Sequence, residues 1–464
     1  MRPWTGYICF FAIASALLSS CTSFANTTNP FDPKTPAKVK EQIETKPVWV
    51  TVYIHGIISI KPHLNIENFI RFIYDDIANT HYEKTVLLMR DDPFFHQNQP
   101  MQNMGMQEIN INHLQRGAGA RLLAHATDKI EQITQPDAPT ENHYYTFGWS
   151  GLMSYNARYL EAKNLYTDLV KIRDEFRAKG KEPHFRLEAY SHGGQVVMLL
   201  GKVRRDEHLD NSLHIDQTVF FGMPVHTFTA EYINDPVFAR VYNIYSPGDR
   251  IQQLDIFTIG QMCSTRIFKK SHLNPAERKL IQIEIRVIRK AGENKKYSDR
   301  ANRNIHYEGP CKSYLLRDVS PGHTELWFFG WTPLHYRKSF PLYPLPIVAI
   351  TPYILNTIKH VEHELQPHQP IIMTLDPAND LTLLKTADDR FARMVPFISA
   401  KKFDPIRKEI GIYEPPAFTN DLYSYHIKLA YDEAHLFRTQ HKIDVRRSRR
   451  KCPNGPNQCK KCMD

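Results

Sequence analysis

Apolar residues in this chain recur with two alternating periods. Short runs rich in β-branched and aromatic residues predict strands, and longer segments with apolar residues every three to four positions predict helices. Strands are predicted at 47–54, 85–89, 143–147, 185–189, 218–221, 238–245, 279–289 and 313–320, and helices at 155–178 and 195–203. This alternation is typical of an α/β fold with a mostly parallel sheet and helices on both faces.

Three segments depart from the simple alternation. Residues 279–289 alternate apolar with polar positions, which predicts an antiparallel or edge strand and indicates an inserted hairpin. Residues 94–119 are rich in Gln, Asn, Met and His and predict a surface loop, with a flexible lid as the alternative. Residues 340–355 are apolar but broken by four prolines, which predicts a docked segment leading into a helix over the sheet rather than a membrane span.

Ser191 stands at the boundary between a strand-like and a helix-like run. Ala189 and Gly193 occupy the positions two residues before and two residues after it. A serine on a sharp strand-to-helix turn exposes its Oγ atom and needs small neighbours, so the pattern predicts a nucleophile elbow. The alternative interpretation is a helix N-cap serine before a glycine-rich start.

Two later turns carry the residue types that a serine nucleophile needs. Asp249 ends a Pro-Gly-Asp turn directly after the strand at 238–245, and His323 follows a Pro-Gly turn directly after the strand at 313–320. A serine hydroxyl is a weak nucleophile near neutral pH, so it requires a base within hydrogen-bond reach and an acid that orients the base. Ser, Asp and His therefore follow one another in the chain, each just beyond a strand.

On these landmarks the chain from His55 to His323 resembles the α/β-hydrolase superfamily, most closely its lipase and serine-esterase members. The resemblance implies an α/β-hydrolase sheet with Ser191 as nucleophile, His323 as general base and then acid, and Asp249 as the orienting carboxylate.

It also implies an oxyanion hole formed by the backbone N–H groups of Ile57 and His192. His55 would then be a structural, hydrogen-bonding residue of the loop that carries Ile57, and the His192 side chain would be structural too.

Other titratable residues compete for these roles. Glu325 is expected to be a solvated or capping carboxylate. His323 and Asp249 are preferred because each occupies a turn that directly follows a strand. The rivals are His306, His335 and His360 for the base, and Asp255 and Asp318 for the acid.

The reaction that the resemblance implies is hydrolysis of carboxylic esters through an acyl-enzyme, with no cofactor and no metal. The substrate would be a small-molecule or lipid ester. The alternative is a non-catalytic cell-surface binding protein built on a hydrolase scaffold.

The N-terminus predicts export. Arg2 precedes an apolar run at 7–18, which is typical of a secretory signal and too short to span a bilayer. Residues 18–21 resemble the bacterial lipobox, which implies a signal peptide at 1–21, lipid modification of Cys21 and a polar tether at 22–46. The expected location is the bacterial cell envelope, as a membrane-anchored lipoprotein. Ordinary secretion after a cleavage site at 23–25 is the alternative.

Length and charge bound the rest of the chain. Its 464 residues allow a hydrolase domain at 47–364, an extension without an assignable motif at 365–445 and a basic tail at 446–464. Much of the net charge of +10 comes from that tail, and no nucleic-acid-binding module accompanies it. A membrane surface, held by the lipid anchor and by the basic tail, is therefore the expected partner.

The seven cysteines leave their pairing open. Cys263 and Cys311 either form a disulfide or remain separate thiols. The three tail cysteines are one ligand short of a closed zinc site, so a disordered basic tail with one disulfide is expected. They are Cys452, Cys459 and Cys462.

Overall fold

A mostly parallel β-sheet of 11 strands organises the residues that the structure, a computed structural model, describes. The described residues are 46–58, 75–209, 212–249, 251–253, 264–273, 279–290, 316–333, 340–366, 368–416 and 418–451. The predicted signal, Cys21, the tether up to residue 45, the pair Cys263 and Cys311, and the tail after Lys451 lie outside these residues.

The main sheet has the order β13-β12-β11-β9-β7-β5-β4-β1-β3-β2, and β10 pairs with β9. The strands from β3 to β11 in this order run parallel, whereas β2, β10, β12 and β13 pair antiparallel. The strands are β1 (Val48–Ile54), β2 (Gly105–Glu108), β3 (Glu141–Gly148), β4 (Pro183–Tyr190), β5 (Ile215–Phe221), β6 (Val225–His226), β7 (Phe238–Tyr245), β8 (Ser264–Thr265), β9 (Leu280–Lys290), β10 (Leu316–Val319), β11 (Ile371–Asp376), β12 (Leu381–Thr386) and β13 (Ala392–Pro396).

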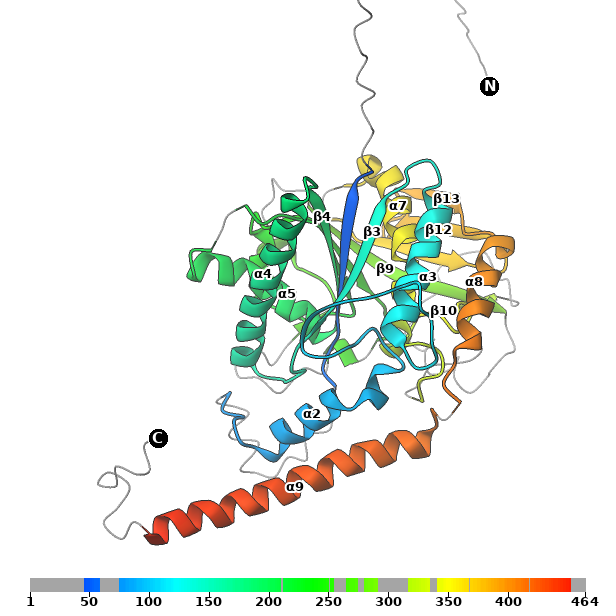
Figure 1. Cartoon of the computed structure of the whole chain (residues 1–464). Coiled ribbons are helices and arrows are strands. Elements are labelled where there is room, and N and C mark those ends of the chain that lie inside the picture. Colours follow the sequence, from blue (N-terminus) through cyan, green and yellow to red (C-terminus); the bar gives the residue numbers. More distant parts are fainter. Residues whose placement is uncertain are drawn as a thin grey trace, which may run out of the picture. The chain divides into compact units, whose positions relative to one another are not determined.

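Helices pack on both faces of this sheet, as the alternation of elements predicts (Figure 1). They are α2 (His81–Asp91), α3 (Gly119–Thr134), α4 (Tyr155–Ala178), α5 (His192–Asp206), α7 (Thr351–Val361), α8 (Ala400–Ile412) and α9 (Asn420–Lys451). Short 3-10 turns include η1 (Pro93–His96), η2 (Ala230–Asn234), η3 (Ile251–Gln253), η4 (Lys270–His272), η6 (Thr324–Leu326), η7 (Ile347–Ile350) and η8 (Glu362–Glu364).

Two large apolar clusters and a small third one, which includes Tyr82 and Val86 of α2, form the core of the described residues. The two large clusters lie on different helices. One contains buried residues of α4 and α5, and the other contains buried residues of α3, α7 and α8. Neighbouring strand residues fall in different clusters: Phe220 of β5 packs with α4 and α5, and Phe221 packs with α3 and α7. This is the expected consequence of a strand whose side chains alternate between two covered faces.

Most predicted elements are confirmed, including β1, β3, β4, β5, β7, α4 and α5, all within a few residues of their predicted bounds. The proline-broken segment at 340–355 is buried for much of its length and leads into α7, which packs on the sheet as expected. Among the described residues, every helix is too short or too polar to cross a bilayer.

The strand predicted at 85–89 is wrong, because this segment is the centre of α2. Thr80 caps the helix, its side chain accepting a hydrogen bond from the backbone N–H of Glu83 at 3.1 Å. Tyr82, Val86 and Met89 are buried at the four- and three-residue spacing of a helix face. The apolar run at 86–89, taken alone, fits a strand and a buried helix equally well. The wider spacing of buried residues in α2 is what distinguishes the two.

The prediction that 279–289 forms an antiparallel or edge strand in an inserted hairpin holds only for a short pairing with the next strand. β9 lies inside the sheet and runs parallel to both β7 and β11. Only the four-residue pairing with β10 is antiparallel. The polar positions of β9 are satisfied within the protein: Gln282 exchanges hydrogen bonds with the backbone of Phe268, and Glu284 pairs with Arg286.

Residues 94–119 are irregular over much of their length, as their composition predicts, but they are more than a surface loop. The segment contains η1 and the edge strand β2, which pairs with β3. Phe94, Phe95, Met101 and Ile109 are buried in the core cluster of α3 and α7. These scattered apolar residues anchor the segment, although polar residues dominate its composition.

Residues after 364 continue the same sheet. β11 pairs with β9, and β12 and β13 follow as an antiparallel meander at one edge. The boundary expected between 364 and 365 therefore does not coincide with a break in the sheet.

Candidate active site

Ser191, Asp249 and His323 meet at the carboxyl edge of the parallel sheet. Ser191 follows β4, and Asp249 ends the turn after β7. His323 arrives from the opposite direction, because β10 runs antiparallel to β9, pairing Val319 with Val287. β9 extends beyond the end of β7, whose last residue pairs with Glu284, so the returning β10 ends close to the Asp249 turn.

Ser191 has a strained backbone at the junction between β4 and α5. Its φ of 51° and ψ of −128° lie in a region that only glycine adopts readily. Ser191 is the N-cap residue of α5, but its side chain makes no capping hydrogen bond. Its Oγ is thus left for another partner, which favours the elbow interpretation over a simple N-cap serine.

Glycines allow the close packing around this turn. A Cβ atom on Gly193 would collide with the carbonyl oxygen of His55, so only glycine fits where α5 begins. Gly222, with a φ of +58°, lies against Asp249 and His323. A Cβ atom there would come within 2.7 Å of Asp249 Oδ2.

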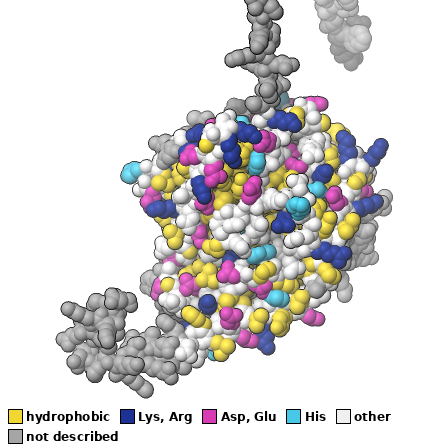
Figure 2. Space-filling view, viewed as in Figure 1, with side chains coloured by type: hydrophobic (Ala, Val, Ile, Leu, Met, Phe, Trp, Pro, Cys, Tyr) yellow, Lys and Arg dark blue, Asp and Glu magenta, His cyan; other side chains and the backbone are white. Residues whose placement is uncertain are grey.

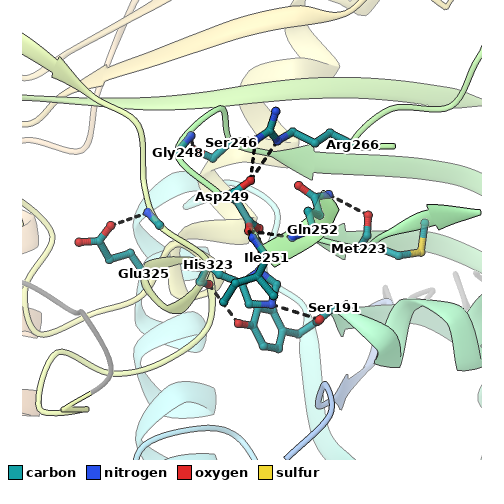
Figure 3. Close-up of polar contacts among 12 residues, drawn as sticks. Ser191, Met223, Ser246, Gly248, Asp249, Ile251, Gln252, Arg266, His323 and Glu325 are labelled. Atoms are coloured by element: carbon teal, nitrogen blue, oxygen red, sulfur yellow. Dashed lines mark hydrogen bonds and ion pairs between the residues drawn. The ribbon is translucent and has the colours of Figure 1, made fainter. Parts of the chain in front are cut away.

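A hydrogen-bond chain links the three side chains (Figure 3). His323 Nε2 lies 3.1 Å from Ser191 Oγ, and His323 Nδ1 lies 2.6 Å from Asp249 Oδ2. The exposed fractions are 3% for Ser191, 9% for His323 and 0% for Asp249. Such burial removes competing water and strengthens the polar contacts.

The second carboxylate oxygen of Asp249 is held by the backbone. Oδ1 accepts hydrogen bonds from the N–H groups of Ile251 at 3.0 Å and Gln252 at 3.2 Å. The Arg266 guanidinium donates to the Asp249 carbonyl oxygen at 2.7 and 3.0 Å and to the Pro247 carbonyl oxygen at 3.2 Å (Figure 3). These contacts fix the turn and aim Oδ2 at His323.

Tyr190, the last residue of β4, contacts His323. Its hydroxyl donates to the His323 carbonyl oxygen at 3.1 Å, and the two ring centroids are 4.6 Å apart. Trp327 also stacks on Tyr190, with ring centroids 5.3 Å apart. Glu325 is buried and accepts from the Gly322 N–H at 2.6 Å, so it caps the turn that carries His323.

Sequence patterns did not identify Tyr190 or Arg266 as parts of the site. Tyr190 looks like an ordinary strand residue, and its contact with His323 depends on the fold of a distant segment. Arg266 stands in a stretch without a recognisable motif. The adjacency of Tyr190 to Ser191 was the one available signal.

The expected oxyanion loop lies against the serine. A Cβ atom on Gly56 would come within 2.9 Å of Ser191 Cβ. The residues just after β1 therefore pass beside Ser191. In the described part of the chain, the N–H of Ile57 has no hydrogen-bond acceptor. His192 is the first residue of α5, where backbone N–H groups have no acceptor within the helix.

The side chains of His55 and His192 are both engaged away from Ser191. His55 donates from Nδ1 to the Gly56 carbonyl oxygen at 2.7 Å, and its Nε2 accepts from the Trp149 N–H at 3.4 Å. Burial, together with the Arg90 charge, holds the pKa of His55 well below its usual value, so the ring is neutral. His192 Nδ1 lies 2.6 Å from Arg158 Nη1.

The described rivals lie on other elements. His360 is in the last turn of α7, where it lines a cavity with Val395 and Lys402. Asp318 belongs to β10. The rivals His306, His335 and Asp255 lie outside the described residues. No three His, Cys, Asp or Glu side chains of the described chain gather in a way that could hold a metal ion.

Comparison of the chain with protein-family models, curated proteins and solved structures gives no significant match.

Proposed function

We propose that the protein is a serine hydrolase of the α/β-hydrolase type that cleaves carboxylic esters through an acyl-enzyme. The main support is one observation: Ser191, on a strained strand-to-helix turn, is joined through His323 to a buried carboxylate, Asp249. Nucleophile, base and orienting acid are thus within hydrogen-bond reach and in the chain order of that superfamily.

In the proposed reaction, Ser191 Oγ attacks the ester carbonyl carbon while His323 Nε2 takes the hydroxyl proton. Asp249 stabilises the resulting imidazolium through the Nδ1 hydrogen bond. The N–H groups of Ile57 and His192 hold the negative oxygen of the tetrahedral intermediate, which then expels the alcohol with the proton from His323. Water, deprotonated by His323, attacks the acyl-enzyme and releases the acid.

Export is part of the proposal. The signal-like N-terminus favours delivery to the bacterial cell envelope, with Cys21 as the lipidated anchor and the basic tail as a second contact with anionic lipid. This location favours lipid esters among the carboxylic esters that such a site can cleave.

Ser191→Ala tests the nucleophile directly. The variant is expected to lower kcat/KM on p-nitrophenyl esters by about 10³-fold or more, because no other hydroxyl replaces Oγ. Ser399→Ala is the matched control, since Ser399 is also a helix N-cap residue whose side chain makes no capping hydrogen bond. The control should keep the wild-type rate. Residual turnover of Ser191→Ala within tenfold of wild type would exclude Ser191 as the nucleophile.

A further inference from the structure

The long C-terminal helix α9 packs through one face only against the body of the protein. It lies along α2, beyond the lower end of β1 in Figure 1. On this inner face the His426 ring stacks on Phe94, with centroids 4.0 Å apart, and His426 Nδ1 lies 2.6 Å from Asp92 Oδ2. Farther along, His81 Nε2 lies 3.0 Å from the Tyr431 carbonyl oxygen. These contacts hold the helix in a defined orientation.

The other side of α9 exposes an apolar stripe formed by Tyr425, Leu429 and Leu436. Their exposed fractions are 58%, 48% and 69%. Spacings of four and seven residues place them on one helix face. Phe437, exposed by 52%, is on a different side of the helix, where its ring centroid is 4.9 Å from Lys84 Nζ of α2. Hydrophobic side chains are visible among charged ones along this edge of the molecule (Figure 2).

This concentration of apolar surface is unusual for the chain. Among the described residues, no other helix or strand exposes more than one large hydrophobic side chain. Single exposed apolar residues are normal, whereas several on one face indicate a binding surface.

The charge of α9 indicates what the surface contacts. The helix continues to Lys451, and five of the last six residues, 446–451, are basic. Asp432 and Glu433 interrupt the stripe, so its apolar area alone is small. An exposed apolar face followed by a dense basic run is typical of a helix that lies on an anionic lipid surface.

The inner face of the same helix also packs on η1, through Phe94 and Phe95. The Tyr423 ring packs edge-on against Phe95, with centroids 5.5 Å apart.

We propose that α9 is a membrane-docking helix. Tyr425, Leu429 and Leu436 insert into the interfacial layer of an anionic bilayer, and the basic run at 446–451 lies among its headgroups. Docking through this face turns the carboxyl edge of the sheet toward the lipid. The docking surface itself is independent of catalysis, whereas presentation of membrane lipid to Ser191 rests on the proposed function.

Vesicle co-sedimentation tests the docking surface without relying on hydrolysis. The full chain is used with Cys21→Ser, which removes the acyl anchor, and with Ser191→Ala, which removes the nucleophile. It should bind vesicles of equal parts phosphatidylglycerol and phosphatidylcholine, and bind pure phosphatidylcholine far less. Leu429→Ser combined with Leu436→Ser should weaken binding about tenfold or more. Leu160→Ser with Ile412→Ser, which alters two exposed apolar residues on α4 and α8, should bind like the parent.

Several results would overturn the proposal. They are equal binding by the stripe variant and its control, no preference of the parent for phosphatidylglycerol, and self-association that the stripe variant abolishes. The last would make the stripe an interface between two copies. Far-UV circular dichroism and thermal unfolding establish that each variant is folded.

Restoring Ser191 tests the link to the active site. The rate on vesicle phospholipid, divided by the rate on a soluble p-nitrophenyl ester, should fall in the stripe variant. An unchanged ratio would contradict lipid presentation through α9. Absence of all hydrolysis in the chain that carries Cys21→Ser but retains Ser191 would instead refute the proposed function and leave the docking result intact.

Discussion

Ser191, the proposed nucleophile, is also a residue with a strained backbone. A non-glycine residue in its conformation costs on the order of 1–3 kcal/mol, which the surrounding structure must offset. Its N–H donates to the Phe221 carbonyl oxygen at 2.9 Å, and its carbonyl oxygen accepts from the Gly194 N–H at 2.9 Å. These bonds tie the turn to β5 and to the first turn of α5, so Oγ is fixed where His323 reaches it.

Asp249→Asn tests whether Asp249 orients His323. It is a sharper test than removal of the side chain, because the amide keeps the shape of the carboxylate. The amide oxygen would keep the hydrogen bonds from the Ile251 and Gln252 N–H groups, which turns the amide NH₂ toward His323. His323 would then accept at Nδ1 and carry its proton on Nε2, where it cannot take the serine proton. We expect kcat/KM to fall about 10³- to 10⁴-fold, close to the effect of His323→Ala.

Steady-state ester hydrolysis, with thermal unfolding as the folding control, measures this effect. A folded Asp249→Asn variant that kept activity within tenfold of wild type would show that Asp249 does not set the tautomer of His323.

The sequence predicts those site residues that stand in a turn directly after a strand. Ser191, Asp249 and His323 each follow a strand, and the structure brings all three together. The supporting residues Tyr190 and Arg266 had no such mark, because their roles arise from contacts between segments far apart in the chain.

At the scale of elements, the errors have a common cause. Periodicity reports which side chains are buried, but not which element buries them. The apolar run in α2, residues 86–89, is four residues long, too short to distinguish a helix from a strand. β9 alternates as an edge strand would, yet its polar side chains Gln282, Glu284 and Arg286 are paired inside the protein. The sequence pattern of β9 therefore did not predict its position between the parallel strands β7 and β11.

β4 carries a buried carboxyl group that should make stability depend on pH. Burial raises the pKa of Glu188 to about 8, although the Arg186 charge and a hydrogen bond from Thr351 act in the opposite direction. The folded protein then retains a proton that the unfolded chain has lost above its ordinary pKa near 4.5. The protonated Glu188 carboxyl group contributes its full stabilisation below pH 4.5. That stabilisation is lost as the pH rises through about 8.

Glu188→Gln removes this titration with little change in shape. The free energy of unfolding of the variant, relative to wild type, should increase by up to about 1.4 kcal/mol per pH unit between the two pKa values and then level off. Denaturant unfolding at several pH values measures the difference. A constant difference between variant and wild type across this range would show that Glu188 does not hold its proton in the folded state.

At the scale of the whole molecule, the proposed site, α2 and α9 share one edge of a sheet that is covered on both faces by helices (Figure 1). The residues expected to form a separate extension complete this sheet through β11, β12 and β13. Sequence alone did not join them to it, because pairing between β9 and β11 leaves no local pattern. Helices cover both faces of the sheet, so the proposed site lies at its carboxyl edge, where parallel α/β sheets commonly bind ligands.

Covalent labelling of the intact protein with a fluorophosphonate tests the central claim most directly. This reagent phosphonylates a serine that is activated by a neighbouring base, with loss of fluoride. Peptide mass spectrometry should find the adduct on Ser191 in the wild-type chain, no adduct in Ser191→Ala, and strongly slowed labelling in His323→Ala. An unlabelled wild-type chain, or an adduct on a different serine, would contradict the account.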